Sequence, residues 1–137
     1  MAVPFLACMV SAAAVFHLPP RVLPAIHAVE GGQMHVASRN ANGSEDLGPM
    51  QVNTVWLPWL ATASGLDTAR VRARLLDDGC FNIAAAGAIL RVELDEAGGD
   101  LLTAVGHYHS HTPALAAGYQ ARVLSAARQM FGGGAGG

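Results

Sequence analysis

The stretch CFNIAAAGAILRVELDE, residues 80–96, decides the fold. Its apolar, alanine-rich face predicts one long helix, and helices of this kind are usually central and buried. Gly98 and Gly99 follow it, and glycine commonly lies just past a helix end. We therefore expect residues 80–96 to form the centre of the fold.

The composition fits a single domain. The chain has 137 residues, of which 52% are hydrophobic and 13% charged. This is enough for one domain with a real core and unlike the polar composition of disordered chains. Alanine is abundant and β-branched residues do not form alternating runs, which favours helices. We predict one all-α domain over residues 1–131, followed by a flexible glycine-rich tail over residues 132–137.

Shorter helices are predicted on both sides of the central one. Apolar spacing and capping residues place them at residues 5–15, 21–30, 53–63, 68–76, 101–108 and 115–131. Between them, residues 33–49 are rich in Asn, Gly, Asp and Pro, which predicts turns without regular structure. A long loop in a small domain is more often functional than not.

Charge and hydropathy exclude two classes of partner. The formal net charge is −2 and no cluster of Arg or Lys occurs, so we expect no binding to nucleic acid. The longest apolar run, residues 3–18, is interrupted by Pro4, Ser11 and His17 and is too short to span a membrane. Lys and Arg are absent before Arg21, so no signal peptide is predicted.

The two cysteines, Cys8 and Cys80, leave two alternatives open. They are too far apart in the sequence for the short-spaced pairs of a metal site. Either they are buried thiols, or they form a disulfide between the first and the central helix. A disulfide would indicate an oxidising compartment.

Glu30 is the candidate for acid chemistry. It ends an apolar helix, in which Leu23, Ile26 and Val29 have helical spacing, and it precedes Gly31 and a polar loop. A carboxyl group against an apolar wall has a raised pKa because its charged form is disfavoured, and a general acid needs such a pKa. The alternative is an ordinary surface glutamate at a helix end.

Two further segments carry groups that suit a sugar ligand. In GPMQVN, residues 48–53, Gln51 and Asn53 supply amide donors and acceptors and Met50 offers a soft apolar surface. Tyr108 can place a hydroxyl group against a carboxyl group and fix its orientation. Taken alone, these segments also fit an ordinary loop-to-helix transition and a half-buried core tyrosine.

The order and spacing of these segments are more specific than each one alone. An apolar helix ends in Glu30, and then follow NANGSEDLG (40–48), GPMQVN (48–53), CFNI (80–83) and VGHYHS (105–110). Tyr119 and Val123 complete the series. In this order the segments resemble the soluble lytic transglycosylases of the lysozyme-like superfamily, and among them the small muramidases of type IV secretion and conjugation machines.

The resemblance covers residues 8–128 and implies a fold and an activity. The implied fold is one small lysozyme-like domain, mainly α with some α+β character and a long substrate loop. The implied activity is cleavage of the β-1,4 bond between N-acetylmuramic acid and N-acetylglucosamine without water, which leaves 1,6-anhydromuramic ends. Glu30 would act first as acid and then as base, with no cofactor and no metal. The resemblance also favours a Cys8–Cys80 disulfide.

Further site residues follow from the resemblance. Those implied to bind substrate are Gln51, Met50, Asn53, Tyr108, Ser38, Asn82 and Tyr119. Tyr108 would also hold Glu30. Glu45 and Asp46 are expected mainly to fix the loop, with a lesser chance that one of them assists catalysis or tunes Glu30.

The resemblance also implies partners and a location. The partners would be peptidoglycan glycan strands and proteins of a secretion or conjugation machine. The location would be periplasmic or extracytoplasmic, with the export signal absent from this sequence. Three positions depart from the family pattern, because Gly31, Pro49 and His109 replace the usual Ser, Leu and Asn, and they affect the shape of the sugar subsites.

Three alternatives remain at this stage. One is a hydrolytic muramidase that uses the same glutamate, and another is a non-catalytic glycan-binding subunit. The third is a metal site at His107, His109 and His111, but alternating residues share a face only in a strand, and these cross a predicted helix end. Residues 27–31, HAVEG, also lack the second histidine of the zinc helix signatures. We therefore predict no metal, and expect the three histidines to border the cleft or to be solvated.

Overall fold

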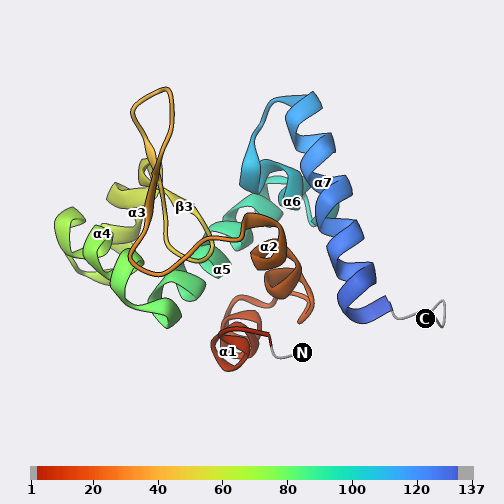
Figure 1. Cartoon of the computed structure of the whole chain (residues 1–137), viewed down its shortest axis with the longest axis horizontal. Helices are drawn as coiled ribbons and strands as arrows, with labels where there is room; N and C mark the ends of the chain where they lie inside the picture. The colour runs from red at the N-terminus through yellow and green to blue at the C-terminus, as the bar shows by residue number, and fades with distance from the viewer. Residues whose placement is uncertain (1–2, 133–137) are drawn as a thin grey trace.

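The computed structural model describes residues 3–132, and its central element is helix α5 (Gly79–Glu96) (Figure 1). The side chain of Asp78 caps this helix by accepting a hydrogen bond from the backbone N–H of Phe81 at 3.0 Å. Helices α1, α4 and α6 all pack against α5. Residues 80–96 therefore have the central position that their apolar face predicts.

The described residues form seven α-helices and one small sheet. Besides α5, the α-helices are α1 (Leu6–Phe16), α2 (Val22–Glu30), α3 (Leu57–Ser64), α4 (Thr68–Asp77), α6 (Leu101–His109) and α7 (Pro113–Ala127). The sheet, α3 and α4 lie on one side of α5, while α2, α6 and α7 lie on the other (Figure 1). The mainly helical fold class is therefore confirmed.

Proline explains where two of the predicted helices differ from the observed ones. Residues 53–63 were expected to form one helix broken near Pro58, but Thr54–Trp56 forms a 3₁₀ turn and α3 begins at Leu57. Helix α7 likewise begins at Pro113, before the expected residue 115. Proline suits the first turn of a helix, where its missing N–H would have no partner. The chain after α7 continues as a π-helical turn, Arg128–Gly132.

The expectation that residues 33–49 lack regular structure is wrong. Strands β1 (Ala37–Arg39), β2 (Glu45–Leu47) and β3 (Val52–Asn53) form an antiparallel sheet in the order β1-β2-β3. The N–H of Gly43 donates to the carbonyl of Asn40 at 3.0 Å and closes the β1–β2 hairpin. Strands this short cannot be recognised in the sequence, because two or three residues cannot display an alternating pattern.

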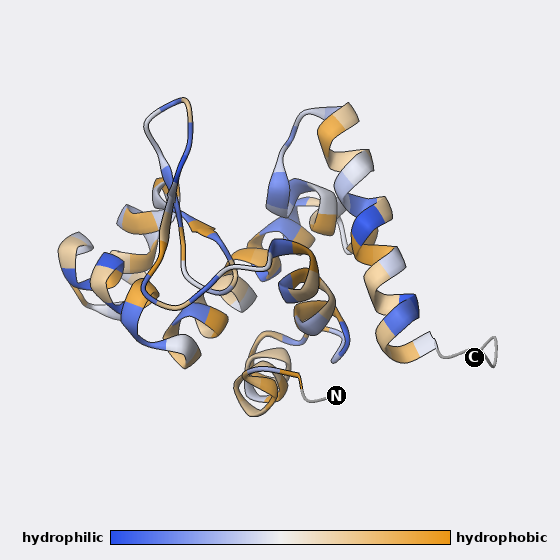
Figure 2. Ribbon diagram, in the orientation of Figure 1, coloured by the Kyte–Doolittle hydropathy of each residue, from blue (hydrophilic) through white to orange (hydrophobic). Residues whose placement is uncertain are grey.

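One apolar core extends along α5 and joins both sides of the molecule. Leu23 and Ile26 of α2, Leu47 of β2, Leu75 of α4 and Leu90 of α5 are all fully buried. Figure 2 shows that α1 is apolar over most of its length, whereas the tip of the β1–β2 hairpin is polar. The polar tip of the hairpin is thus suited to contact solvent or a polar ligand.

Within residues 3–132, no helix is long and apolar enough to cross a membrane.

Cys8 and Cys80 form the expected disulfide. Their Cα atoms are 5.3 Å apart, and the bond ties α1 to the first turn of α5. The predicted tail, residues 132–137, lies outside the described residues except for Gly132, which ends the π-helical turn.

Reduction of this disulfide should destabilise the protein. The bond closes a long loop, since the two cysteines are 72 residues apart. In the chain-entropy model its loss lowers the free energy of unfolding by about 4 kcal/mol. Urea unfolding with and without a reductant measures this change, and thiol titration verifies complete reduction. An unchanged unfolding midpoint in fully reduced protein would contradict the expectation.

Candidate functional site

Glu30 is the last residue of α2. Gly31 follows in the left-handed conformation, with φ 62°, and its N–H donates to the carbonyl of His27 at 2.9 Å. Leu23 and Ile26 anchor the helix in the core with no exposed surface. The helix end is therefore fixed, and it presents a half-buried carboxyl group.

The hydroxyl group that holds Glu30 belongs to Tyr119 of α7. It donates to Oε2 of Glu30 at 2.6 Å, and the tyrosine is buried, with 1% of its surface exposed. The prediction that Tyr108 holds Glu30 is wrong, because the Tyr108 hydroxyl donates to the backbone carbonyl of Met50 at 2.8 Å. Tyr119, predicted to bind substrate directly, lies behind Glu30 and positions it.

The surroundings of Glu30 raise the pKa of its carboxyl group. Burial is the largest cause, since it disfavours the charged form. The Tyr119 hydrogen bond and the charge of Arg122 lower the pKa, while the nearby charge of Asp46 raises it. Burial prevails over these opposing effects, so Glu30 holds its proton at higher pH than an exposed glutamate does.

Two side chains pack on Tyr119, one from the end of α6 and one from the next turn of α7. The imidazole of His109 stacks on its ring with centroids 4.8 Å apart and planes only 6° from parallel. The guanidinium of Arg122 lies 5.6 Å from the same ring centroid. Burial, and then the charge of Arg122, lower the pKa of His109 and favour its neutral form. These contacts restrict the tyrosine that orients Glu30.

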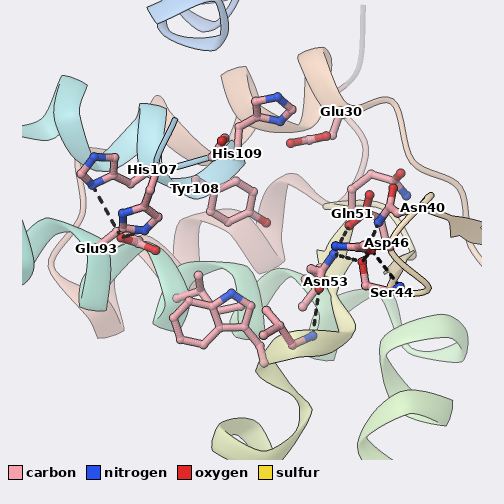
Figure 3. Close-up of a pocket in the computed structure, with 17 residues that line it drawn as sticks. Glu30, Asn40, Ser44, Asp46, Gln51, Asn53, Glu93, His107, Tyr108 and His109 are labelled. Atoms are coloured by element: carbon pink, nitrogen blue, oxygen red, sulfur yellow. Dashed lines mark hydrogen bonds and ion pairs between the residues drawn. The ribbon is translucent and has the colours of Figure 1, made fainter. Parts of the chain in front are cut away.

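Glu30 opens onto a cleft with a volume of about 410 Å³. The side of the cleft formed by the hairpin and β3 is largely polar, and the end of α6 forms the opposite side (Figure 3). The residues that line it are Glu30, Asn40, Asn42, Ser44, Asp46, Gln51, Val52, Asn53, Val55, Trp56, Ile89, Glu93, His107, Tyr108, His109, Ser110 and His111. The cleft therefore combines one shielded acid with many hydrogen-bonding groups.

Hydrogen bonds preorganise the polar side of the cleft. The amide of Asn53 donates to Ser44 Oγ at 3.1 Å and to Asp46 Oδ1 at 3.0 Å. The amide of Gln51 donates to the carbonyl of Gly48 at 3.0 Å. Gln51 and Asn53 both line the cleft, as predicted for ligand-binding residues.

Asn82 and Met50 support the cleft from behind and do not line it. Asn82 is fully buried, donates to the carbonyls of Leu47 and Leu75 at 2.9 Å, and accepts from the N–H of Met50 at 2.9 Å. Met50 is also fully buried. Their predicted contact with substrate is therefore wrong. Met50 lies in a tight turn, where the sequence does not show which way a side chain points, and Asn82 lies on the buried face of α5.

Two glycines permit the turn that carries Gln51. Gly48 has φ 66°, and a Cβ atom there would collide with the carbonyl of Leu75 and the amide of Asn82. A Cβ atom on Gly32 would collide with the carbonyl of Gly48. Three parts of the chain therefore meet at one tightly packed point. They are the end of β2, the start of the loop after Glu30, and α5.

Ser38 and Glu45 lie away from the cleft. Ser38 is exposed on β1 and does not line the cavity. Both carboxylate oxygens of Glu45 accept hydrogen bonds from Arg72, the shortest at 2.9 Å, which ties the hairpin to α4. Of the two auxiliary acids, only Asp46 lies in the cleft.

Several cleft residues were not predicted as functional. Asn40, Asn42 and Ser44 belong to the loop motif, so their polar character was a usable signal. Trp56 and Glu93 gave no signal, because Trp56 lies in an apolar segment and Glu93 lies in the mostly apolar central helix.

Compared with models of known protein families and with curated protein sequences, the chain matches none of them.

Replacement of Asn82 should destabilise the fold. Asn82→Ala would remove the hydrogen bonds that its side chain makes to three backbone groups, at a cost of about 3 kcal/mol in the free energy of unfolding. Urea denaturation measures the change, and Gln33→Ala is the control because Gln33 is exposed. A loss no larger than that of the control would show that Asn82 does not hold the turn.

Proposed function

We propose that the protein is a peptidoglycan lytic transglycosylase that cleaves the bond between N-acetylmuramic acid and N-acetylglucosamine. The observation that carries this proposal is the Glu30 carboxyl group, which is half-buried, held by Tyr119 at 2.6 Å and open to the polar cleft. The ordered resemblance of the sequence motifs to such enzymes supports the substrate class.

In the first step, protonated Glu30 donates its proton to the glycosidic oxygen. The bond from that oxygen to the anomeric carbon of the muramyl sugar breaks, and positive charge develops on this carbon. The raised pKa of Glu30 favours the protonated form that this step needs. Tyr119 fixes one carboxyl oxygen, Oε2, and so limits the directions in which the group can point.

In the second step, the C6 hydroxyl of the muramyl sugar attacks the anomeric carbon. Its oxygen closes the 1,6-anhydro ring, and its proton passes to the Glu30 carboxylate. The muramyl acetamido group assists by stabilising the developing charge. Glu30 thus regains its initial state, so the cycle needs no water and no second catalytic carboxylate.

The polar side of the cleft would bind the sugar. Gln51 and Asn40 would offer their remaining amide groups to sugar hydroxyl and acetamido groups. Asn53 would shape this side of the cleft, because its amide is already bonded to Ser44, Asp46 and Val55. Trp56 offers an aromatic face at the edge of the same cleft. Because the hydrogen bonds of Asn53 are already formed, little side-chain entropy is lost when the ligand binds.

The proposed setting is outside the cytoplasm. The Cys8–Cys80 disulfide supports it, since such bonds persist in oxidising compartments. There the enzyme would open the wall locally for a secretion or conjugation machine, whose proteins would be its partners.

A hydrolytic muramidase is the second candidate, and Asp46 favours it. This carboxylate lies in the cleft and close enough to Glu30 to raise its pKa. In a hydrolase, a carboxylate in this position would activate a water molecule. The two candidates share the acid and differ in the product.

Glu30→Gln should abolish cleavage of purified peptidoglycan. An amide cannot donate and recover the proton, so the rate should fall at least about a hundredfold. Mass spectrometry of the soluble products measures it. Glu96→Gln is the matched control, because it makes the same chemical change at an exposed residue outside the cleft and should retain cleavage.

The product masses separate the candidates. Muropeptides with 1,6-anhydro ends, lost in Glu30→Gln, are the expected result. Products one water heavier would establish hydrolysis in place of transglycosylation. Normal turnover by the variant, or no products from the folded wild-type protein, would contradict the proposed enzyme, and the second result would favour a glycan-binding subunit.

A further inference from the structure

A second cluster of chemically reactive groups lines the same cleft. It consists of Glu93 from α5, His107 from the last turn of α6 and His111 from the segment between α6 and α7. Figure 3 shows Glu93 and His107 close together and apart from Glu30. Nε2 of His111 lies 3.5 Å and Nδ1 of His107 lies 4.0 Å from Oε2 of Glu93. Both rings therefore turn a nitrogen toward one carboxylate oxygen.

Glu93 is a buried acid, and one of its carboxylate oxygens has no hydrogen-bond partner within residues 3–132. Only 3% of the surface of Glu93 is exposed, and this oxygen, Oε2, is itself buried. Buried carboxylates are otherwise hydrogen-bonded, paired with a cation or bound to a metal. The titratable groups nearest Glu93 are His111, His107 and the acidic Glu96, and within residues 3–132 no Arg or Lys pairs with it.

The two histidine rings stack too closely to suit two positive charges. Their rings stack with centroids 4.1 Å apart and planes 18° from parallel. Two protonated imidazoles at this separation would repel each other. Two neutral imidazoles do not, and each keeps a nitrogen lone pair that can bind a metal.

We propose that Glu93, His107 and His111 form a binding site for a divalent transition-metal ion, of which zinc is the best match. Two imidazole nitrogens and one carboxylate oxygen are donors that zinc takes, and sites with three protein ligands keep a fourth position open. Here the fourth position faces the cleft, where water or an oxygen atom of a bound ligand completes the coordination. The site rests on side-chain geometry and does not depend on the proposed function.

The spacing of the three donors permits this site once the His111 ring turns out of its stack with His107. Their ligand atoms all lie within 4.8 Å of one another. Bonds of normal length in a tetrahedral zinc site place the ligand atoms about 3.3 Å apart. The side chain of His111 is 66% exposed and is therefore free to move toward the other two. Glu93 and His107 come from α5 and α6, which pack against each other and hold the remainder of the site.

The site accounts for two of the three alternating histidines. The third, His109, stacks on Tyr119 and belongs to the Glu30 site. His107 and His111 are four residues apart and converge on Glu93, which is distant in the sequence. The prediction of no metal considered only ligands close together in the sequence.

Titration calorimetry on untagged, chelator-treated protein tests the proposal. Zinc chloride should bind with one-to-one stoichiometry and micromolar or tighter affinity, and it should raise the melting temperature. Cobalt(II) should give the visible absorption of a four-coordinate site. His111→Ala should weaken binding at least about tenfold, as loss of supporting groups alone does in known metal sites. Because His111 is exposed, this variant should fold normally.

Two further variants complete the test. Glu93→Gln keeps the size of the side chain and should also weaken zinc binding, while His109→Gln is the matched control and should bind zinc normally. Absence of saturable binding by the wild-type protein would overturn the proposal. So would unchanged affinity in His111→Ala, or an equal loss in His109→Gln.

Discussion

The removal of the Glu30 carboxyl group from water is the constraint on which the site depends. The apolar helix α2 ends at this residue and is anchored in the core, so the carboxyl group stays beside buried side chains. Burial raises its pKa, and Tyr119 opposes this with a 2.6 Å hydrogen bond that also fixes its direction. The balance raises the pKa of the carboxyl group, which lines the cleft. Helix α7 and the stacked His109 serve this arrangement by holding Tyr119.

Helix α5 supports the cleft at two places. Near its start, Asn82 binds three backbone groups and sets the turn that carries Gln51. Further along, Glu93 meets His107 and His111. These two positions lie about 16 Å apart on a regular helix, so one rigid element spaces the turn that carries Gln51 and the proposed metal site. Three hydrogen bonds offset the cost of burying the Asn82 amide.

Much of the fold could be predicted from the sequence, since long helices display their period and caps. The central helix, the position of Glu30 at a helix end and the Cys8–Cys80 bond follow from local patterns or from the family resemblance, and the structure contains each of them. The sheet could not be predicted, because its strands are too short to show alternation. Tertiary contacts decided the rest. Which tyrosine reaches Glu30 depends on how α7 packs on α2, and the partnership of Glu93 with two histidines depends on the contact between α5 and α6.

The pKa of Glu30 is the measurement that tests this account most directly. A pH titration of its carboxyl ¹³C resonance should give a value above the ordinary glutamate pKa of about 4.3. Asp46→Asn should lower that pKa by removing a repelling charge, and Tyr119→Phe should raise it by removing a hydrogen bond to the charged form. An ordinary or lowered pKa in the wild-type protein would contradict the account, because Glu30 would then lose its proton too readily to serve as the acid.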